Sequence, residues 1–136
     1  MKAVCIMLAL GLAVGASLCA RAQESACPHA SEVGQAHLLG RWHAEVEGDA
    51  PALLLLEKHA VYGASVSGTL ERAGQRRSVA GDVDDGEFTL EESADGVRIA
   101  AAWLGEIVEG SCGREIRGQW VPDGEQAGRN FVLRKQ

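Results

Sequence analysis

The chain of 136 residues has little positive charge: 13 Lys and Arg stand against 19 Asp and Glu, a formal net charge of −6. Nucleic acids and anionic membrane surfaces attract basic proteins, so this deficit argues against both as partners. The sequence also lacks a second long apolar run. After residue 20 no stretch approaches the ~18 residues that a membrane-spanning helix needs. We therefore expect no nucleic-acid partner and no membrane span in the mature chain.

The sequence further lacks an arrangement of residues that would identify an enzyme. The four histidines show no H-E-x-x-H pattern, and segment 63–68 contains no G-x-S-x-G nucleophile elbow. In the acidic segment 82–87, Gly86 arrives too early for a calcium loop, so a hairpin turn with solvated acids is the better interpretation. No carboxyl group stands out as a buried general acid. The sequence favours a non-catalytic protein without a cofactor or a metal.

The first residues have the pattern of a secretory signal. Lys2 precedes an apolar run that ends at Leu18, and Ala20-Arg21-Ala22 has the small-x-small pattern that signal peptidase recognises. We expect residues 1–22 to be removed and the mature chain to lie in the periplasm or outside the cell. A lipoprotein anchored through Cys19 is the rival interpretation, although Leu18 is large where lipoprotein processing requires a small residue.

Cysteine is scarce, and its positions fit an oxidising compartment such as the periplasm or the cell exterior. Cys27 and Cys112 are the two that remain after removal of the signal, so the sequence predicts one disulfide between them. A metal site that includes Cys27 and His29 is the rival hypothesis, but the spacing matches no zinc pattern. Residues 23–37 are polar and small, and we interpret them as an N-terminal arm without apolar anchors of its own, tied down through Cys27.

From residue 38 onward the hydropathy pattern alternates, as in half-buried strands, so residues 38–136 are predicted to be one β domain. Asp85-Gly86 and Asp95-Gly96 lie between alternating runs and are strong hairpin signals. The run 53–56 does not alternate, which predicts a strand covered on both faces by the arm. Eight strands are predicted, centred on residues 42–46, 53–56, 62–71, 79–83, 88–90, 97–103, 116–120 and 131–133.

Glycines recur inside the predicted strands. Gly68 and Gly81 are 13 residues apart, and so are Gly105 and Gly118. Glycine within a strand marks a bend or a close approach of two backbones, which a sheet that closes on itself requires. We therefore favour an all-β, eight-stranded antiparallel up-and-down β-barrel over a sandwich.

The chain has few aromatic residues, three Trp, one Tyr and two Phe, and they fall on the apolar face of the predicted strands. Inside an eight-stranded barrel such side chains either fill the core or surround one small ligand. Both interpretations remain open at this point. If a ligand site exists, its predicted lining residues are Trp42, Tyr62, Leu70, Phe88, Trp103 and Trp120.

Three segments resemble avidins and, more broadly, the lipocalin-like barrels called calycins. The segment 39–42, Leu-Gly-Arg-Trp, resembles the Gly-x-Trp signature of a first strand. The segment 67–72, Ser-Gly-Thr-Leu-Glu-Arg, is similar to the avidin strand T-G-T-Y-E-S. Residues 103–110 with the later Gln119-Trp120 resemble W-S-G-Q-Y-V-G-G and its following Q-W. The resemblance implies a ligand inside the barrel. Ala44, Leu70 and Arg72 stand where the family has polar biotin-binding residues, so biotin is not the expected ligand.

A second family is similar in outline: periplasmic inhibitors of secreted metalloproteases, which are disulfide-bonded barrels with an arm before an L-x-G-x-W strand. Two functions follow. The first is a secreted or periplasmic protein that holds a small apolar or amphipathic ligand inside its barrel. The alternative is an inhibitor of a protease or another secreted enzyme whose arm, residues 23–37, enters the target. The first requires a cavity, and the second requires a projecting arm.

Overall fold

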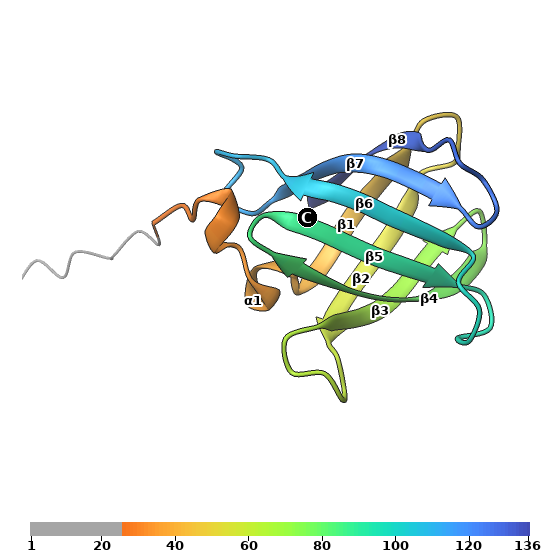
Figure 1. The fold of residues 1–136 in the computed structure, drawn as a ribbon, viewed down its shortest axis with the longest axis horizontal. Coiled ribbons are helices and arrows are strands. Elements are labelled where there is room, and N and C mark those ends of the chain that lie inside the picture. Colours follow the sequence, from red (N-terminus) through yellow and green to blue (C-terminus); the bar gives the residue numbers. More distant parts are fainter. Residues whose placement is uncertain (1–25) are drawn as a thin grey trace, which may run out of the picture.

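The computed structural model describes residues 26–136, so the predicted signal peptide, residues 1–22, lies outside the described residues. Two short helical turns precede a set of strands (Figure 1). No helix in the described part is long and apolar enough to cross a membrane. The elements are η1 (Ala30–Glu32), α1 (Gln35–Leu38), β1 (Gly40–Val46), β2 (Ala52–Lys58), β3 (Val66–Arg72), β4 (Gln75–Asp84), β5 (Glu87–Ser93), β6 (Ala101–Ile107), β7 (Glu115–Pro122) and β8 (Arg129–Lys135).

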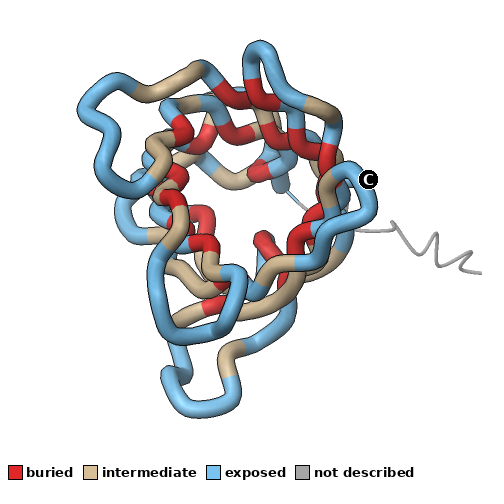
Figure 2. The backbone as a smooth tube through the Cα atoms, turned by 90° about the vertical axis from the view of Figure 1, so that its right-hand side faces the viewer, coloured by how far each residue is buried: buried red, intermediate tan, exposed pale blue. Residues whose placement is uncertain are grey.

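The eight strands form one closed antiparallel barrel in which each strand pairs with its neighbours along the chain. Closure comes from β1, which pairs with β2 on one side and with β8 on the other; Trp42 lies opposite Leu54 and also opposite Lys135. Figure 2 looks along the barrel, and the buried segments of the strands follow one another around its wall. The predicted all-β, eight-stranded up-and-down barrel is confirmed.

Two-residue turns connect β3 to β4 and β4 to β5, whereas the connection that holds Asp95-Gly96, between β5 and β6, is a longer loop. At the β4–β5 hairpin Asp85 and Gly86 have φ angles of 47° and 81°, and at the β3–β4 hairpin Ala73 and Gly74 have 48° and 77°. Two successive positive φ angles are the mark of a type I′ turn, whose twist matches that of the flanking strands. The Asp-Gly signal therefore located a hairpin correctly.

Two strand glycines lie where neighbouring backbones approach most closely. A Cβ atom on Gly68 would be 1.8 Å from the carbonyl oxygen of Leu55, and one on Gly118 would be 2.0 Å from that of Leu104. Any side chain at either position would collide with the adjacent strand. The prediction that the strand glycines mark close backbone approaches in a closed sheet is confirmed at these positions.

The inward face of the strands forms a single hydrophobic core. Trp42 and Trp103 are fully buried, and Trp103 makes edge-to-face contacts with Phe131 and Trp120 at centroid distances of 5.0 and 6.4 Å. Such pairs stabilise a core beyond the area that they bury. The largest other side chains buried in it belong to Leu54, Leu56, Leu70, Phe88, Leu90, Ile116 and Leu133.

Two predicted strand beginnings were wrong. Tyr62 is 65% exposed in the β2–β3 loop, because the ring Nδ1 of His59 accepts the backbone N–H groups of Val61 and Tyr62, both at 3.1 Å, and holds the chain in a turn. Val97 is 86% exposed because its backbone N–H bonds to the carboxylate of Asp95 at 2.9 Å instead of joining β6.

The prediction that the run 53–56 is covered on both faces was also wrong. Leu54 and Leu56 are buried in the core, but Leu53 is 38% exposed on the outer face. The strand is therefore half-buried like its neighbours, and leucine simply occupies its outward positions. The arm that was expected to cover it lies at one end of the barrel instead (Figure 1).

Residues 26–38 cover one end of the barrel, which we call the closed end. Val33 and Leu38 are buried, at 3% and 0% exposure. Gln35 Nε2 donates to the carbonyl oxygen of Ser65 in the β2–β3 loop at 2.6 Å. The expectation that the arm, residues 23–37, has no apolar anchors was therefore wrong, because Val33 joins the core.

A hydrogen-bonded group around Trp42 joins this cover to the barrel. The Trp42 indole N–H donates to the carbonyl oxygen of Leu38 at 2.8 Å. Lys135, near the end of β8, places its Nζ 5.8 Å from the Trp42 ring centroid and donates to the carbonyl oxygen of His37 at 2.5 Å. Desolvation lowers the pKa of Lys135. The first strand, the last strand and α1 are thus linked at one point.

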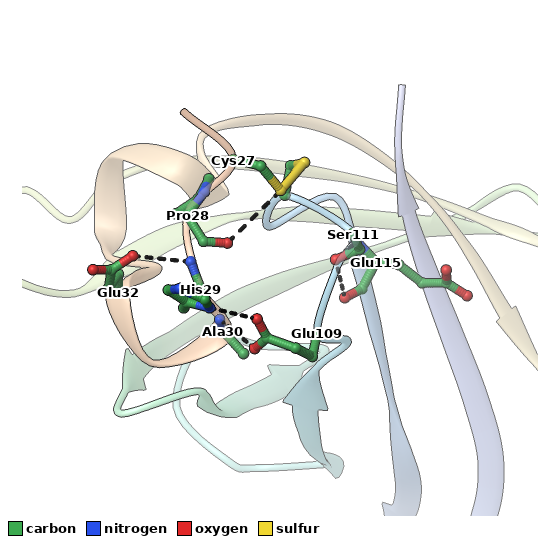
Figure 3. Close-up of a disulfide and its surroundings, with 9 residues drawn as sticks. Cys27, Pro28, His29, Ala30, Glu32, Glu109, Ser111 and Glu115 are labelled. Atoms are coloured by element: carbon green, nitrogen blue, oxygen red, sulfur yellow. Dashed lines mark hydrogen bonds and ion pairs between the residues drawn. A yellow bond between two sulfur atoms is a disulfide. The ribbon is translucent and has the colours of Figure 1, made fainter. Parts of the chain in front are cut away.

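The predicted disulfide is present: Cys27 bonds to Cys112 in the β6–β7 turn, with their Cα atoms 4.6 Å apart. Beside it, Glu109 accepts the backbone N–H of Ala30 at 2.8 Å and pairs with His29 Nδ1 at 2.8 Å (Figure 3). The hydrogen bond and charge of Glu109 raise the pKa of His29. The pKa of Glu109 is lowered, most by the hydrogen bond from the Ala30 backbone and next by His29. The disulfide and the ion pair hold the arm against the same turn.

Candidate functional site

The other end of the barrel, which we call the open end, is formed by the connections 48–51, 73–74, 94–100 and 123–128. It lies at the right of Figure 1 and faces the viewer in Figure 2. The last inward positions of several strands at this end carry charged side chains instead of apolar ones. These side chains belong to Arg72 of β3, Arg77 of β4, Glu92 of β5 and Arg129 of β8.

Glu92 is the buried centre of this group, with its side chain only 1% exposed. Its Oε2 atom accepts the indole N–H groups of Trp103 at 3.0 Å and Trp120 at 3.1 Å. Its Oε1 atom lies 3.5 Å from Arg72 Nη1 and 3.4 Å from Arg77 Nε. A buried carboxylate is tolerated when it is both paired and hydrogen-bonded, and Glu92 satisfies both conditions.

Arg72 lies between Glu92 and the tryptophans, with its side chain 14% exposed. The guanidinium carbon is 5.3 Å from the Trp120 ring centroid and 5.9 Å from that of Trp103, within the range of cation–π attraction. Two of its nitrogens, Nε and Nη2, are buried and have no hydrogen-bond partner among the described residues. The side chain is therefore firmly placed while part of its donor capacity is unused.

Asp49, in the β1–β2 turn, lies beside Arg72 and Arg129. Its Oδ2 atom is 3.7 Å from Arg72 Nε and 3.8 Å from Nη2 of Arg129, beyond hydrogen-bonding distance in both cases. Arg129 itself lies over the Trp120 ring at 4.6 Å. The group therefore holds three guanidinium groups and two carboxylates, an excess of one positive charge in an acidic protein.

A cavity of about 420 Å³ opens to solvent at this end. Arg72, Arg77 and Glu92 form its charged part, and Trp120 with Ala100 and Pro122 forms its apolar part. The arrangement combines a small apolar wall with placed hydrogen-bond donors, as ligand pockets commonly do. Asp49, Ala73 and Gln75 complete the lining.

The structure divides the ligand-lining residues predicted from the sequence into three sets. Trp103 and Trp120 lie at the open end and bind Glu92, and Trp120 lines the cavity. Trp42 and Phe88 are buried toward the closed end, and Leu70 is buried in the core. Tyr62 lies outside the barrel in a surface groove with His59 and Leu104.

The residues that sequence reasoning missed are the charged ones, Arg72, Arg77, Glu92, Arg129 and Asp49. A signal for four of them was present. Arg72 and Glu92 continue the inward alternation that begins at Val66 and at Phe88. Arg77 and Arg129 precede the buried Val79 and Phe131 by two residues in the same way. A charge on an inward position at the end of a strand is the pattern that reveals such a site.

No protein-family model and no curated protein matches this chain. The fold itself, a closed barrel of eight antiparallel strands, is compatible with a calycin-like architecture. Within that architecture the Trp of the Gly-x-Trp segment, Trp42, lies under α1 at the closed end, away from the open-end cavity. The charged group and the cavity at the open end are therefore the features that indicate a function.

Proposed function

We propose that this protein is a secreted or periplasmic, non-catalytic binding protein that takes a small amphipathic ligand into the open end of its barrel. The observation that carries the proposal is the cavity at this end, in which the Trp120 ring lies beside the half-buried guanidinium of Arg72 and the buried carboxylate of Glu92. The Cys27–Cys112 disulfide is compatible with an oxidising compartment. Deeper in the barrel, aromatic side chains contact one another, so the proposed ligand occupies the open end instead of the whole interior.

The alternative function, inhibition of a secreted enzyme through residues 23–37, needs an arm that projects from the barrel. Residues 26–37 instead lie against the closed end, held by the disulfide and the buried Val33. A segment fixed in this way would have to detach before it entered a target. The geometry therefore favours ligand binding at the open end.

The binding proposal is tested with the fluorescent probe 8-anilinonaphthalene-1-sulfonate (ANS), an amphipathic aromatic compound whose emission rises in apolar surroundings. We expect saturable binding of one probe per chain. Ala100→Phe places a ring at the wall of the cavity and should abolish the binding, because it leaves the charged residues in place but fills the space. Ala60→Phe, in the exposed β2–β3 loop at the closed end, is the matched control and should bind the probe normally.

Unfolded or loosened proteins also bind this probe, so the near-ultraviolet circular dichroism of each variant must match that of the unchanged protein. Equal binding by Ala100→Phe and by the control would place the probe elsewhere and contradict the proposal.

A further inference from the structure

We propose that the open end recognises the anionic head group, a carboxylate or sulfonate, of its amphipathic ligand, that Arg72 binds this group, and that Asp49 competes with the ligand for the same guanidinium. The inference rests on the proposed function and names the chemical class of its ligand.

Arg72 is held ready for an anion before any ligand arrives. One side of its guanidinium is fixed by Glu92, whose Oε1 lies 3.5 Å from Nη1, and the guanidinium carbon lies 5.3 Å from the Trp120 ring centroid. Glu92 is in turn held by two indole N–H groups. A guanidinium that is already oriented loses little freedom when it binds a ligand, which raises affinity. Glu92, Trp103 and Trp120 are therefore positioning residues for Arg72.

The donors that remain on Arg72 match a charged oxygen group. Nε and Nη2 form one edge of the guanidinium, and this edge presents two parallel N–H groups of the kind that bind carboxylates in a bidentate manner. Both nitrogens are buried without a hydrogen-bond acceptor among the described residues. Leaving such donors unsatisfied is unfavourable, so an acceptor that reaches them gains the full strength of a charge-assisted bond.

Asp49 marks where that acceptor would lie. Its carboxylate faces Arg72 Nε and Arg129 Nη2 from 3.7 and 3.8 Å, close enough to attract both but too far to hydrogen-bond with either. It sits in the β1–β2 turn, and its side chain is 27% exposed, so it can move aside without disturbing a strand. A ligand carboxylate or sulfonate that enters the cavity would displace Asp49 and take its place between the two arginines.

The charge balance agrees with this exchange. With Asp49 in place, Arg72, Arg77 and Arg129 face two carboxylates, Asp49 and Glu92. Displacing Asp49 leaves three positive groups against Glu92 alone, which a ligand of one negative charge restores to the original excess. A neutral head group would leave the three arginines with one carboxylate, Glu92, to balance their charge, so it should bind more weakly.

The experiment compares two probes of similar size that differ in charge: ANS, which carries a sulfonate, and the neutral N-phenyl-1-naphthylamine. Direct fluorescence titration gives both dissociation constants. We expect the unchanged protein to bind ANS at least about tenfold more tightly, the effect expected of charge-assisted hydrogen bonds in a partly buried site. This comparison needs no variant.

Three variants locate the source of the preference. Arg72→Gln should weaken the binding of ANS much more than that of the neutral probe, and so remove the preference for ANS. Asp49→Asn should tighten ANS binding about three- to tenfold, since the competing charge is gone, and should change the binding of the neutral probe less. Asp123→Asn removes the same charge from the β7–β8 turn at the same end, so it measures the effect of net charge alone and should change ANS binding little.

Each outcome has a defined meaning. Equal affinities for the two probes in the unchanged protein, a preference that survives Arg72→Gln, or equal effects of Asp49→Asn and Asp123→Asn would overturn the inference but leave the binding function standing. If neither probe binds, the proposed function fails and the inference fails with it. Should Arg72→Gln not fold, the unchanged protein and the two aspartate variants still decide between these outcomes.

Discussion

The indole N–H of Trp103 donates to Oε2 of Glu92 at 3.0 Å, although the two residues lie on different strands and Glu92 is fully buried. They are two residues apart in the β5–β6 register, where Glu92 pairs with Ala101 and Leu90 pairs with Trp103. This diagonal contact, together with the one from Trp120, holds a fully buried carboxylate beside the apolar core of the barrel.

Replacing Glu92 should therefore destabilise the barrel. Glu92→Ala leaves two buried indole N–H groups and two arginines without their acceptor, and we expect a loss of about 3–5 kcal/mol in the free energy of unfolding. Glu92→Gln keeps an oxygen for the indoles and should lose less, about 1–2 kcal/mol. Urea denaturation measures both values. Glu91→Gln, one residue away on the exposed face, should stay within about 0.5 kcal/mol; equal effects at the two positions would contradict the account.

The strand glycines give a second stability prediction. Gly118→Ala puts a methyl group 2.0 Å from the backbone oxygen of Leu104, so the strands must separate locally, and we expect a loss of about 2–3 kcal/mol. Gly63→Ala is the matched control, since nothing lies within 4 Å of a Cβ at that position. Thermal unfolding of the two variants tests the contrast, and a neutral Gly118→Ala would show that the barrel adapts without strain.

The disulfide closes a segment of 85 residues, for which the chain-entropy model gives roughly 4–5 kcal/mol as an upper figure. The double variant Cys27→Ser/Cys112→Ser should lose about 2–4 kcal/mol and keep its strands, because Val33 and Leu38 still anchor the cover. Hydrogen exchange should show residues 27–38 opening before the strands do. The mass of the unchanged protein should be two hydrogen atoms below that of the reduced chain. Simultaneous opening of residues 27–38 and of the strands in the variant would show that they are one cooperative unit.

The ion pair between His29 and Glu109 predicts a pH dependence for the arm. The His29 contribution is complete below its ordinary pKa of 6.5 and is lost as pH rises through its raised folded-state value. The Glu109 contribution is complete above the ordinary 4.5 and is lost as pH falls through its lowered folded-state value. Attachment of the arm should therefore be firmest between about pH 4.5 and 6.5.

Exchange protection of the Ala30 amide, which bonds to Glu109, should follow this window. Glu109→Gln should return the pKa of His29, measured by NMR titration, toward 6.5. An unchanged His29 titration in that variant would mean that another group raises its pKa.

The fold followed from the sequence to the extent that local chemistry controls it. Alternation from Phe88 to Leu90 and the Asp85-Gly86 turn each depend on a few adjacent residues, and both were correct. Tyr62 and Val97 were misplaced because their backbone N–H groups donate to His59 and Asp95 and hold both residues in loops, and the hydropathy pattern does not record such bonds.

The candidate site was harder to foresee, since it depends on which strand positions meet across the barrel. Trp120 was predicted to line a pocket, and it does line the open-end cavity. Its meeting with Arg72 brings together β3 and β7, which are not neighbours in the sheet. The sequence of either strand alone does not show that the other strand faces it. When the strand register is unknown, a charged residue at the end of an alternating run is interpreted as the exposed end of a strand.

The pairing of β1 with β8 also bears on how this protein could aggregate. Among the described strands every one has a partner on both sides, so the folded barrel offers no free edge onto which a strand of a second molecule could add. A strand of a second molecule could add only after two neighbouring strands of the barrel separate. Strand β1 has the fewest paired residues, five with each neighbour, so separation is expected there first. Lys135 and α1 fasten that same strand through Trp42, so the contacts at the closed end also guard against fibre formation.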